Sequence, residues 1–212
     1  MQQGRNKDLS AQSPSADQKQ KSPAKAALGQ LDSQGRVTLD LSIRPDEFKL
    51  VAVLGEGAYG TVYKGEWNHS DVAIKKLKVQ KFSAQALEEF KREAEIMFEL
   101  GHASDFIVRL KRICLEAQNY ALVMELMPKG SLYDLLHNGQ ELPWSLRYRI
   151  ALDATYGLQM LHGRNILHRD LKSLNILLND QLRAKLCDFG LAQIKQETSS
   201  QSSVSAKGTP RE

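Results

Sequence analysis

The sequence predicts an α+β protein in which a strand-rich part comes first and a mainly helical part follows. Between residues 48 and 124, short apolar runs are separated by glycine and polar turns, a pattern typical of strands. Between residues 131 and 162, apolar residues instead recur at helical spacing. Pro128, Gly130 and Ser131 mark the crossing from one part to the other.

The first part contains predicted strands and one helix. The strands cover residues 48–54, 61–65, 72–75, 106–110 and 120–124. The helix begins after Ser83, a residue type that caps helix N-termini, and Gly101 lies just past its end. Its apolar face is formed by Leu87, Phe90, Ala94 and Met97.

The second part begins with helices and continues into a hairpin. A short helix follows Ser131, and a longer one runs from residue 143 to 162. Two short strands, 176–178 and 182–186, are joined by a turn at residues 179–180. We expect this hairpin to bring Asn175 and Asp188 together, because they lie just outside its two strands.

Composition excludes several classes of protein. The chain has 212 residues, 42% hydrophobic and 25% charged, which is ordinary globular composition. Residues 1–36 carry six Lys or Arg and three Asp or Glu, which leaves 23 Lys or Arg and 22 Asp or Glu in the rest of the chain. The folded part is therefore nearly neutral, which argues against nucleic-acid binding. Cys114 and Cys187 lack metal-ligand spacing, and no apolar run has the length of a membrane span. A cytoplasmic protein is expected; the oligomeric state is left open.

The N-terminal residues predict a separate segment. Residues 1–40 are rich in Gln, Ser, Ala and Lys and contain no aromatic residue, so they are expected to form a disordered polar tail. A docking or targeting arm, phosphorylated before its prolines, is the alternative interpretation.

The stretch from His168 to Gly190 carries the richest chemistry. Asp170 can accept a proton, and Lys172 can hold a phosphate. Asn175 and Asp188 offer oxygens to a hard cation such as Mg²⁺. Together these groups indicate phosphoryl transfer.

A glycine pattern near the start of the sheet supports nucleotide binding. Residues 55–62 have the spacing G-x-G-x-x-G-x-V, which also marks dinucleotide-binding folds, but those folds need a helix directly after the glycines. Here a strand follows, so a β-turn-β lid over phosphates is favoured, with a plain hairpin as the alternative. Lys75 ends the next apolar strand, from which its ammonium can reach the phosphates.

Two motifs resemble those of the eukaryotic-type protein kinase family. Residues 168–175, HRDLKSLN, resemble the catalytic loop, and residues 188–190, DFG, resemble the magnesium-binding triplet. Lys172 and the Gly-Thr-Pro at residues 208–210 resemble serine/threonine kinases, and Ser173 with residues 130–132 resembles the tyrosine-kinase-like branch.

The resemblance implies a two-lobe domain over residues 48–212. A five-stranded antiparallel N-lobe would cover about 48–124, a hinge 125–130, and the first part of a helical C-lobe 131–212. The chain stops before the Ala-Pro-Glu element of the family. Mg²⁺ and ATP are the implied cofactors, and a protein Ser or Thr is the implied substrate.

The resemblance also implies roles for individual residues. Asp170 would accept the proton of the substrate hydroxyl, Lys172 would steady the γ-phosphate, and Lys75, held by Glu93, would position the other phosphates. Asn175 and Asp188 would hold Mg²⁺. The remaining nucleotide contacts would be Leu54, Gly55, Gly57, Gly60, Val62, Ala73, Met124, Glu125, Met127 and Leu177.

Regulation is predicted in the hydroxyl-rich segment after the magnesium triplet. Ser205 matches the family's usual phosphorylation position, and a phosphate there can pair with Arg169, whose guanidinium suits bidentate phosphate contacts. Thr209 is expected to hydrogen-bond near Asp170 and Lys172 instead. Thr198, Ser202 and Ser203 are rival sites, and a merely mobile polar loop is the alternative.

Other functions remain open at this stage. An ATP-binding regulatory fragment or scaffold without turnover is the alternative to a serine/threonine kinase, because the predicted C-lobe is incomplete. A dinucleotide-dependent oxidoreductase is disfavoured by the missing helix. Cys187 is expected to be a packing thiol, or else a site for covalent ATP-competitive ligands. A bacterial effector acting in host cytoplasm is a further possible setting.

Overall fold

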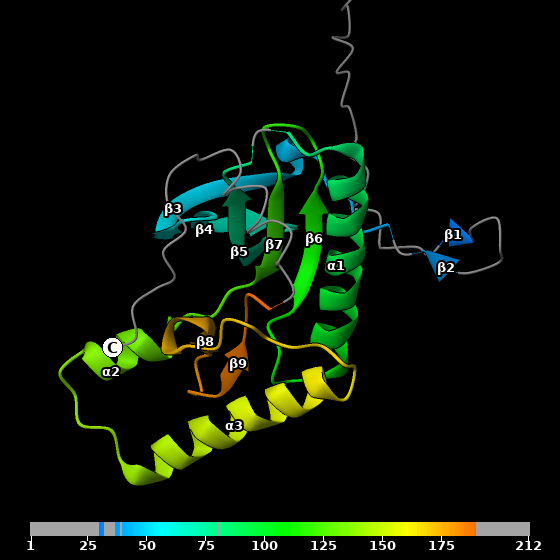
Figure 1. The fold of residues 1–212 in the computed structure, drawn as a ribbon. Coiled ribbons are helices and arrows are strands. Elements are labelled where there is room, and N and C mark those ends of the chain that lie inside the picture. Colours follow the sequence, from blue (N-terminus) through cyan, green and yellow to red (C-terminus); the bar gives the residue numbers. More distant parts are fainter. Residues whose placement is uncertain (1–29, 32–36, 39, 80, 190–212) are drawn as a thin grey trace, which may run out of the picture.

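A computed structural model describes residues 30–31, 37–38, 40–79 and 81–189. A five-stranded antiparallel sheet with the strand order β3-β4-β5-β7-β6 forms one end of the molecule, and helix α1 runs beside it (Figure 1). Helices α2 and α3 and the hairpin β8-β9 form the other end. The predicted α+β class and the five-stranded antiparallel sheet are confirmed.

The elements have the following bounds. The sheet contains β3 (Phe48–Gly57), β4 (Gly60–Trp67), β5 (Ser70–Leu77), β6 (Leu110–Cys114) and β7 (Ala121–Glu125). The helices are α1 (Ala84–Ala103), α2 (Leu132–His137) and α3 (Trp144–His162). The short elements are β1 (Gln30–Leu31), β2 (Val37–Thr38), β8 (Ile176–Leu178), β9 (Ala184–Leu186) and the 3₁₀ turns Pro45–Glu47 and Ser173–Asn175.

Helix α1 forms where its capping and periodicity predict. Ser83 caps it by accepting a hydrogen bond from the backbone N–H of Ala86 at 3.2 Å. Phe90, Ala94 and Met97 are buried against the sheet, in a hydrophobic cluster that continues into the other end of the molecule through Leu161 and other residues. One core therefore joins the two parts of the chain.

Helix α1 continues past the predicted end. Gly101 lies inside the helix rather than beyond it, so that boundary was wrong. A Cβ on Gly101 would lie 2.8 Å from Cα of Arg109. Gly101 therefore allows a close approach of the following chain segment and does not end the helix.

The predicted strand at residues 106–110 was placed incorrectly. β6 begins only at Leu110, and the residues before it bond to β9 instead. Val108 donates its N–H to the carbonyl of Leu186, and Leu186 donates to the carbonyl of Phe106, both at 2.9 Å. The segment thus ties the sheet to the hairpin.

Order begins ahead of Phe48. Leu41 and Ile43 are buried, and residues 41–43 run parallel to β6 at the edge of the sheet. Ile43 donates its N–H to the carbonyl of Ile113 at 2.8 Å, and Ile113 donates to that of Leu41 at 2.9 Å. Further upstream, β1 pairs with β2 in a segment predicted to be disordered.

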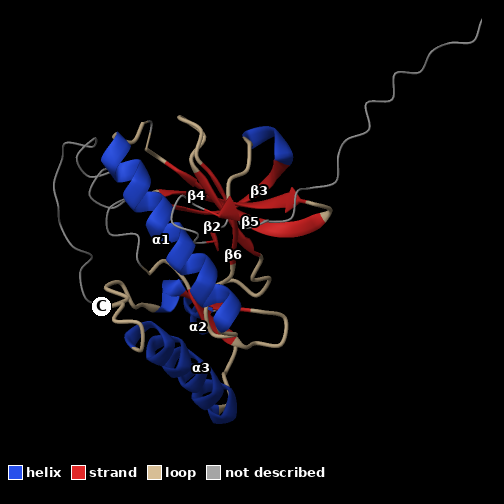
Figure 2. Ribbon diagram, turned by 90° about the vertical axis from the view of Figure 1, so that its right-hand side faces the viewer, coloured by secondary structure: helices blue, strands red, loops and turns tan. Residues whose placement is uncertain are grey.

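Helix α3 is anchored to the hairpin by a buried carboxylate. Asp153, only 1% exposed, accepts hydrogen bonds from Nε and Nη2 of Arg183 at 2.8 and 2.7 Å, and from the N–H of Ala184 at 3.0 Å. Figure 2 shows α3 lying across the end of the molecule, below α1 and the sheet.

One face of α3 leaves apolar side chains exposed. Its exposed aromatic and aliphatic residues recur every fourth position: Trp144, Tyr148, Leu152 and Tyr156. The loop that follows the helix adds exposed leucines at positions 167, 171 and 174. In the described part of the chain, no helix is both long and apolar enough to span a membrane.

Candidate active site

The loop between α3 and β8 brings three predicted residues together. Asn175 is buried and its side-chain amide donates to the backbone carbonyl of Asp170 at 2.8 Å and to Oδ2 of Asp170 at 3.3 Å. Nζ of Lys172 lies 3.3 Å from Oδ1 of the same carboxylate. The amide and the ammonium together hold the Asp170 carboxylate in place.

The backbone of this loop adopts an unusual conformation at Arg169. Its φ of 63° is in the left-handed region, which costs free energy for a residue with a long side chain. Neighbouring contacts hold it there: Asp170 donates its N–H to Nδ1 of His168 at 3.4 Å, and the buried His168 ring lies 6.2 Å from that of Phe189. His168 thus supports the loop as a packed side chain.

Asp188 lies beside the loop because of the β8-β9 hairpin. Cys187 donates its N–H to the carbonyl of Asn175 at 3.0 Å, which closes the hairpin and places Asp188 next to Asn175. Asp188 also has a left-handed φ of 60°. Left-handed backbone at two positions of one site indicates a conformation imposed by surrounding structure.

Lys75 pairs with a different carboxylate from the one predicted. Its ammonium lies 2.7 and 2.6 Å from Oδ1 and Oδ2 of Asp188, not against Glu93. The predicted pair of Lys75 and Glu93 is not formed in this conformation and stays a prediction. The Lys75 side chain is only 8% exposed and needs a counter-charge, and Asp188 presents both carboxylate oxygens to it.

Glu93 is left half-buried on α1 without that cation. One of its carboxylate oxygens, Oε2, is buried and has no hydrogen-bond partner among the described residues. Burial, with a smaller contribution from the charge of Glu89, raises the pKa of Glu93 from its ordinary 4.5 to about 7. Glu93 is thus poised between its neutral and ionised forms.

The glycine turn joins β3 and β4 above this cluster. A Cβ on Gly60 would lie 2.3 Å from the carbonyl oxygen of Lys76, so only glycine allows the strands to approach this closely. At Gly55 a Cβ would meet no atom within 4 Å, and at Gly57 only the carbonyl oxygen of Gly60 at 3.9 Å. The turn therefore leaves open space where phosphates are predicted, next to Leu54, which is exposed.

The other predicted nucleotide contacts lie on neighbouring strands. Met124 on β7 pairs with Ala73 on β5, and Val62 on β4 pairs with Lys75. Met127 is buried just after β7, and Leu177 on β8 is bridged to Ser131. The sheet and the hairpin thus carry these residues, except for Met127, which lies between β7 and α2.

The donor set fits a magnesium ion in part. Asp188 and Asn175 offer the carboxylate and amide oxygens that Mg²⁺ prefers. No group of three or more His, Cys, Asp or Glu side chains in the described ranges could hold a metal by itself. A Mg²⁺ ion usually takes further ligands from water and substrate phosphates.

Comparison with known proteins identifies the family. The model of the protein tyrosine and serine/threonine kinase family matches residues 48–211. The chain belongs to the protein kinase family. The family predicted from the catalytic loop and the magnesium triplet is therefore confirmed.

Relatives of this kinase domain carry concordant names. A probable serine/threonine-protein kinase of Dictyostelium discoideum is 40% identical over 161 residues, covering 75% of this chain and 17% of the relative. Dual specificity protein kinase shkC of the same organism is 40% identical over 172 residues, or 79% of this chain and 34% of the relative. Serine/threonine-protein kinase CTR1 of Arabidopsis thaliana is 40% identical over 176 residues, which cover 81% of this chain and 21% of the relative. The chain thus spans only a minor part of these relatives.

A buried ion pair partner that the sequence did not suggest is Lys185 of the kinase domain. Its ammonium lies 2.7 and 3.0 Å from the carboxylate of Glu125, at the end of β7. Lys185 stands between Ala184 and Leu186 in an alternating strand, and all three are buried. The side chain of Glu125 therefore faces Lys185.

Other predicted residues have simpler surroundings. Arg169 is exposed, and Ser205 and Thr209 lie outside the described residues. Burial, followed by the charge of Asp188, raises the pKa of the Cys187 thiol well above its ordinary value. Cys187 accordingly suits packing and is a poor nucleophile at neutral pH.

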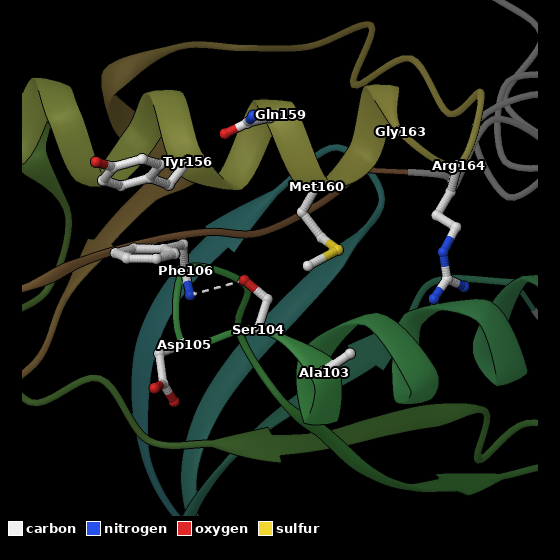
Figure 3. A pocket seen from close by; sticks show the side chains of 9 residues that line it. All are labelled: Ala103, Ser104, Asp105, Phe106, Tyr156, Gln159, Met160, Gly163 and Arg164. Atoms are coloured by element: carbon white, nitrogen blue, oxygen red, sulfur yellow. Dashed lines mark hydrogen bonds between the residues drawn. The ribbon is translucent and has the colours of Figure 1, made fainter.

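A hollow of about 660 Å³ lies away from the predicted residues of this kinase site. It is formed by the C-terminal ends of α1 and α3, with Met160 pointing into it and Arg164 at one end (Figure 3). The rings of Tyr156 and Phe106 lie 5.0 Å apart at the other end. None of the predicted catalytic or nucleotide-binding residues lines it.

Proposed function

We propose that this chain carries the catalytic machinery of a serine/threonine protein kinase, which transfers the γ-phosphate of Mg-ATP to a Ser or Thr hydroxyl of a protein. The observation that supports this most is the convergence of Asp170, Lys172, Asn175 and Asp188 around the β8-β9 hairpin. A cytoplasmic location, where ATP is abundant, belongs to the same proposal.

Each residue has a distinct part in the proposed reaction. Asp170, held by Asn175 and Lys172, accepts the proton of the attacking hydroxyl. The ammonium of Lys172, beside the same carboxylate, reaches the phosphoryl group that is being transferred. Asn175 and Asp188 would hold the magnesium ion, which supplies positive charge to the phosphates when it is bound.

Lys75 must change partner during the proposed cycle. Both oxygens of Asp188 are engaged by its ammonium, so the carboxylate cannot serve a metal until Lys75 leaves. Glu93, whose Oε2 has no partner among the described residues, offers the next counter-charge. We propose that Lys75 moves to Glu93, from where it positions phosphates as the family pattern implies.

The test is Asp170→Asn in the full-length protein. We expect phosphotransfer to a generic protein substrate to fall by about 10²–10⁴-fold, since a general base contributes that much. The circular dichroism spectrum should not change. Asp180→Asn, an exposed acid in the hairpin turn, is the matched control and should retain activity.

Two results would contradict the proposal. Substantial transfer by Asp170→Asn would remove Asp170 from the chemistry. Binding of Mg-ATP by the natural protein without any transfer would favour an ATP-binding regulatory fragment. The acceptor is tested by phosphoamino-acid analysis, in which predominant phosphotyrosine would overturn the serine/threonine assignment; this matters because one relative is named a dual specificity kinase.

Regulation by phosphorylation is part of the same proposal. The exposed guanidinium of Arg169 next to Asp170 suits a bidentate contact with a phosphate on Ser205. Thr209 is proposed to hydrogen-bond near Asp170 and Lys172. Ser205→Ala should lower activity, and Arg169→Ala should abolish the difference between phosphorylated and unphosphorylated protein.

A further inference from the structure

Lys185 forms a partly buried ion pair across the junction of the two lobes. It is 7% exposed on β9, and its Nζ lies 2.7 Å from Oε1 and 3.0 Å from Oε2 of Glu125. Oε1 of Glu125 also accepts a hydrogen bond from the backbone N–H of Arg109 at 2.7 Å. The carboxylate is thus held by a cation from one lobe and an amide from the other.

Backbone hydrogen bonds connect the same chain segments around this ion pair. Glu125 donates its own N–H to the carbonyl of Arg109 at 3.0 Å. Val108 and Leu186, next to Arg109 and Lys185, are hydrogen-bonded at 2.9 Å. The segment before β6, the end of β7 and strand β9 therefore form one hydrogen-bonded unit, with the ion pair at its centre.

The Lys185–Glu125 ion pair lies between the proposed adenine-binding and magnesium-binding parts of the site. Glu125 opens the proposed hinge, whose backbone groups meet the adenine. Lys185 lies on β9, three positions before Asp188, the proposed magnesium ligand, which follows the end of that strand. The ion pair therefore links the hinge, which is proposed to hold the adenine base, to the segment of Asp188, which is proposed to hold the phosphate-bound metal.

The burial of the Lys185 ammonium indicates that the geometry of this ion pair is used. A buried ammonium is costly unless it is paired and hydrogen-bonded, and apolar residues often stabilise such a place equally well. The pair also stands apart from Arg183 and Asp153, which anchor the same strand to α3 and lie away from the hinge. Stability alone therefore does not require a second ion pair on β9.

We propose that Lys185 is a positioning residue for the nucleotide: acting through Glu125, it fixes the hinge relative to β9 and to Asp188, which follows β9. This inference rests on the proposed kinase function. Without the ion pair, base and phosphate contacts no longer have a set spacing, and a rigid ligand such as ATP cannot satisfy both at once.

The test is the affinity of the full-length protein for a non-hydrolysable ATP analogue with Mg²⁺, measured by calorimetry. Lys185→Met should weaken binding about tenfold, which corresponds to about 1.4 kcal/mol. In turnover, the KM for ATP should rise while kcat changes less than about twofold. Adding Glu125→Gln to Lys185→Met should cost no further affinity, since the two side chains act as a unit.

Arg183→Met is the matched control. It removes a cation from the chain next to the same strand, so it should lower the unfolding midpoint but leave the dissociation constant for the analogue unchanged. Lys185→Arg, which preserves the charge, should keep most of the affinity. If Lys185→Met does not fold, Glu125→Gln, which keeps an acceptor for the Arg109 amide, gives the same comparison with the natural protein.

The outcomes separate this inference from the function on which it rests. Unchanged or tighter analogue binding in Lys185→Met, or equal loss in Arg183→Met, would overturn the positioning role. Failure of the natural protein to bind the analogue with Mg²⁺ would instead overturn the proposed kinase function.

Discussion

Replacing Glu93 by Gln should stabilise the protein at alkaline pH while impairing the proposed catalysis. Glu93 is half-buried, one of its carboxylate oxygens has no partner among the described residues, and its pKa is raised to about 7. A carboxyl group with a raised pKa holds its proton more tightly in the folded state than in the unfolded one. Its charge therefore destabilises the fold as pH rises from about 4.5 to about 7.

The magnitude follows from the two pKa values. The interval from 4.5 to about 7 corresponds to at most about 3.5 kcal/mol, at about 1.4 kcal/mol per pH unit. Partial exposure of the side chain screens its charge, and a buried amide has hydrogen-bonding needs of its own. We therefore expect Glu93→Gln to gain about 1 kcal/mol at pH 8 and much less at pH 5, which lies only slightly above the ordinary pKa of 4.5.

The assay is urea unfolding at pH 5 and pH 8, with phosphotransfer measured in parallel at pH 8. Glu95→Gln, an exposed acid on the same helix, is the control and should shift neither midpoint. Activity of Glu93→Gln should fall at least tenfold, because the amide cannot neutralise Lys75. A loss of stability at pH 8, or the same change at both pH values, would refute the reasoning.

Three further substitutions test the fold around the site by urea unfolding. Asp153→Asn should cost about 2–3 kcal/mol because it disrupts three hydrogen bonds to a buried carboxylate, and a cost below about 0.5 would contradict that role. Leu41→Ala should cost about 2–3 kcal/mol, whereas Arg44→Ala on the exposed side of the same segment should cost little; equal effects would show that residues 41–43 are not part of the core. Gly60→Ala should separate β4 from β5, because its Cβ would meet the carbonyl of Lys76 at 2.3 Å, and an unchanged midpoint and nucleotide affinity would argue against that packing.

Most elements of the fold were predictable because their signals are local. Helix α1 has both a capping residue, Ser83, and an apolar face at helical spacing. The β8-β9 hairpin has a polar turn between two short apolar strands. Residues 106–109 were misplaced because a short apolar run indicates a strand without indicating its partner, which here is β9, far along the chain.

The pairing of charges in the site was not predictable in the same way. Lys75 could be matched to either Glu93 or Asp188 by residue type, and only the folded geometry shows that Asp188 holds it. Lys185 stands in an alternating strand, where a charged residue suggests an exposed face. It is buried because β9 is covered on both sides, which depends on contacts that the local pattern does not contain.

The exposed face of α3 has a consequence for handling the protein. Exposed aromatic and aliphatic side chains recur along this face from Trp144 to Tyr156, and the loop that follows the helix adds further exposed leucines. Apolar surface of this kind promotes contact between molecules, and the hydrophobic driving force weakens on cooling. Preparations of the 212-residue chain should therefore remain monodisperse best when cold, dilute and free of sulfate, and should scatter more light when warmed below the unfolding transition.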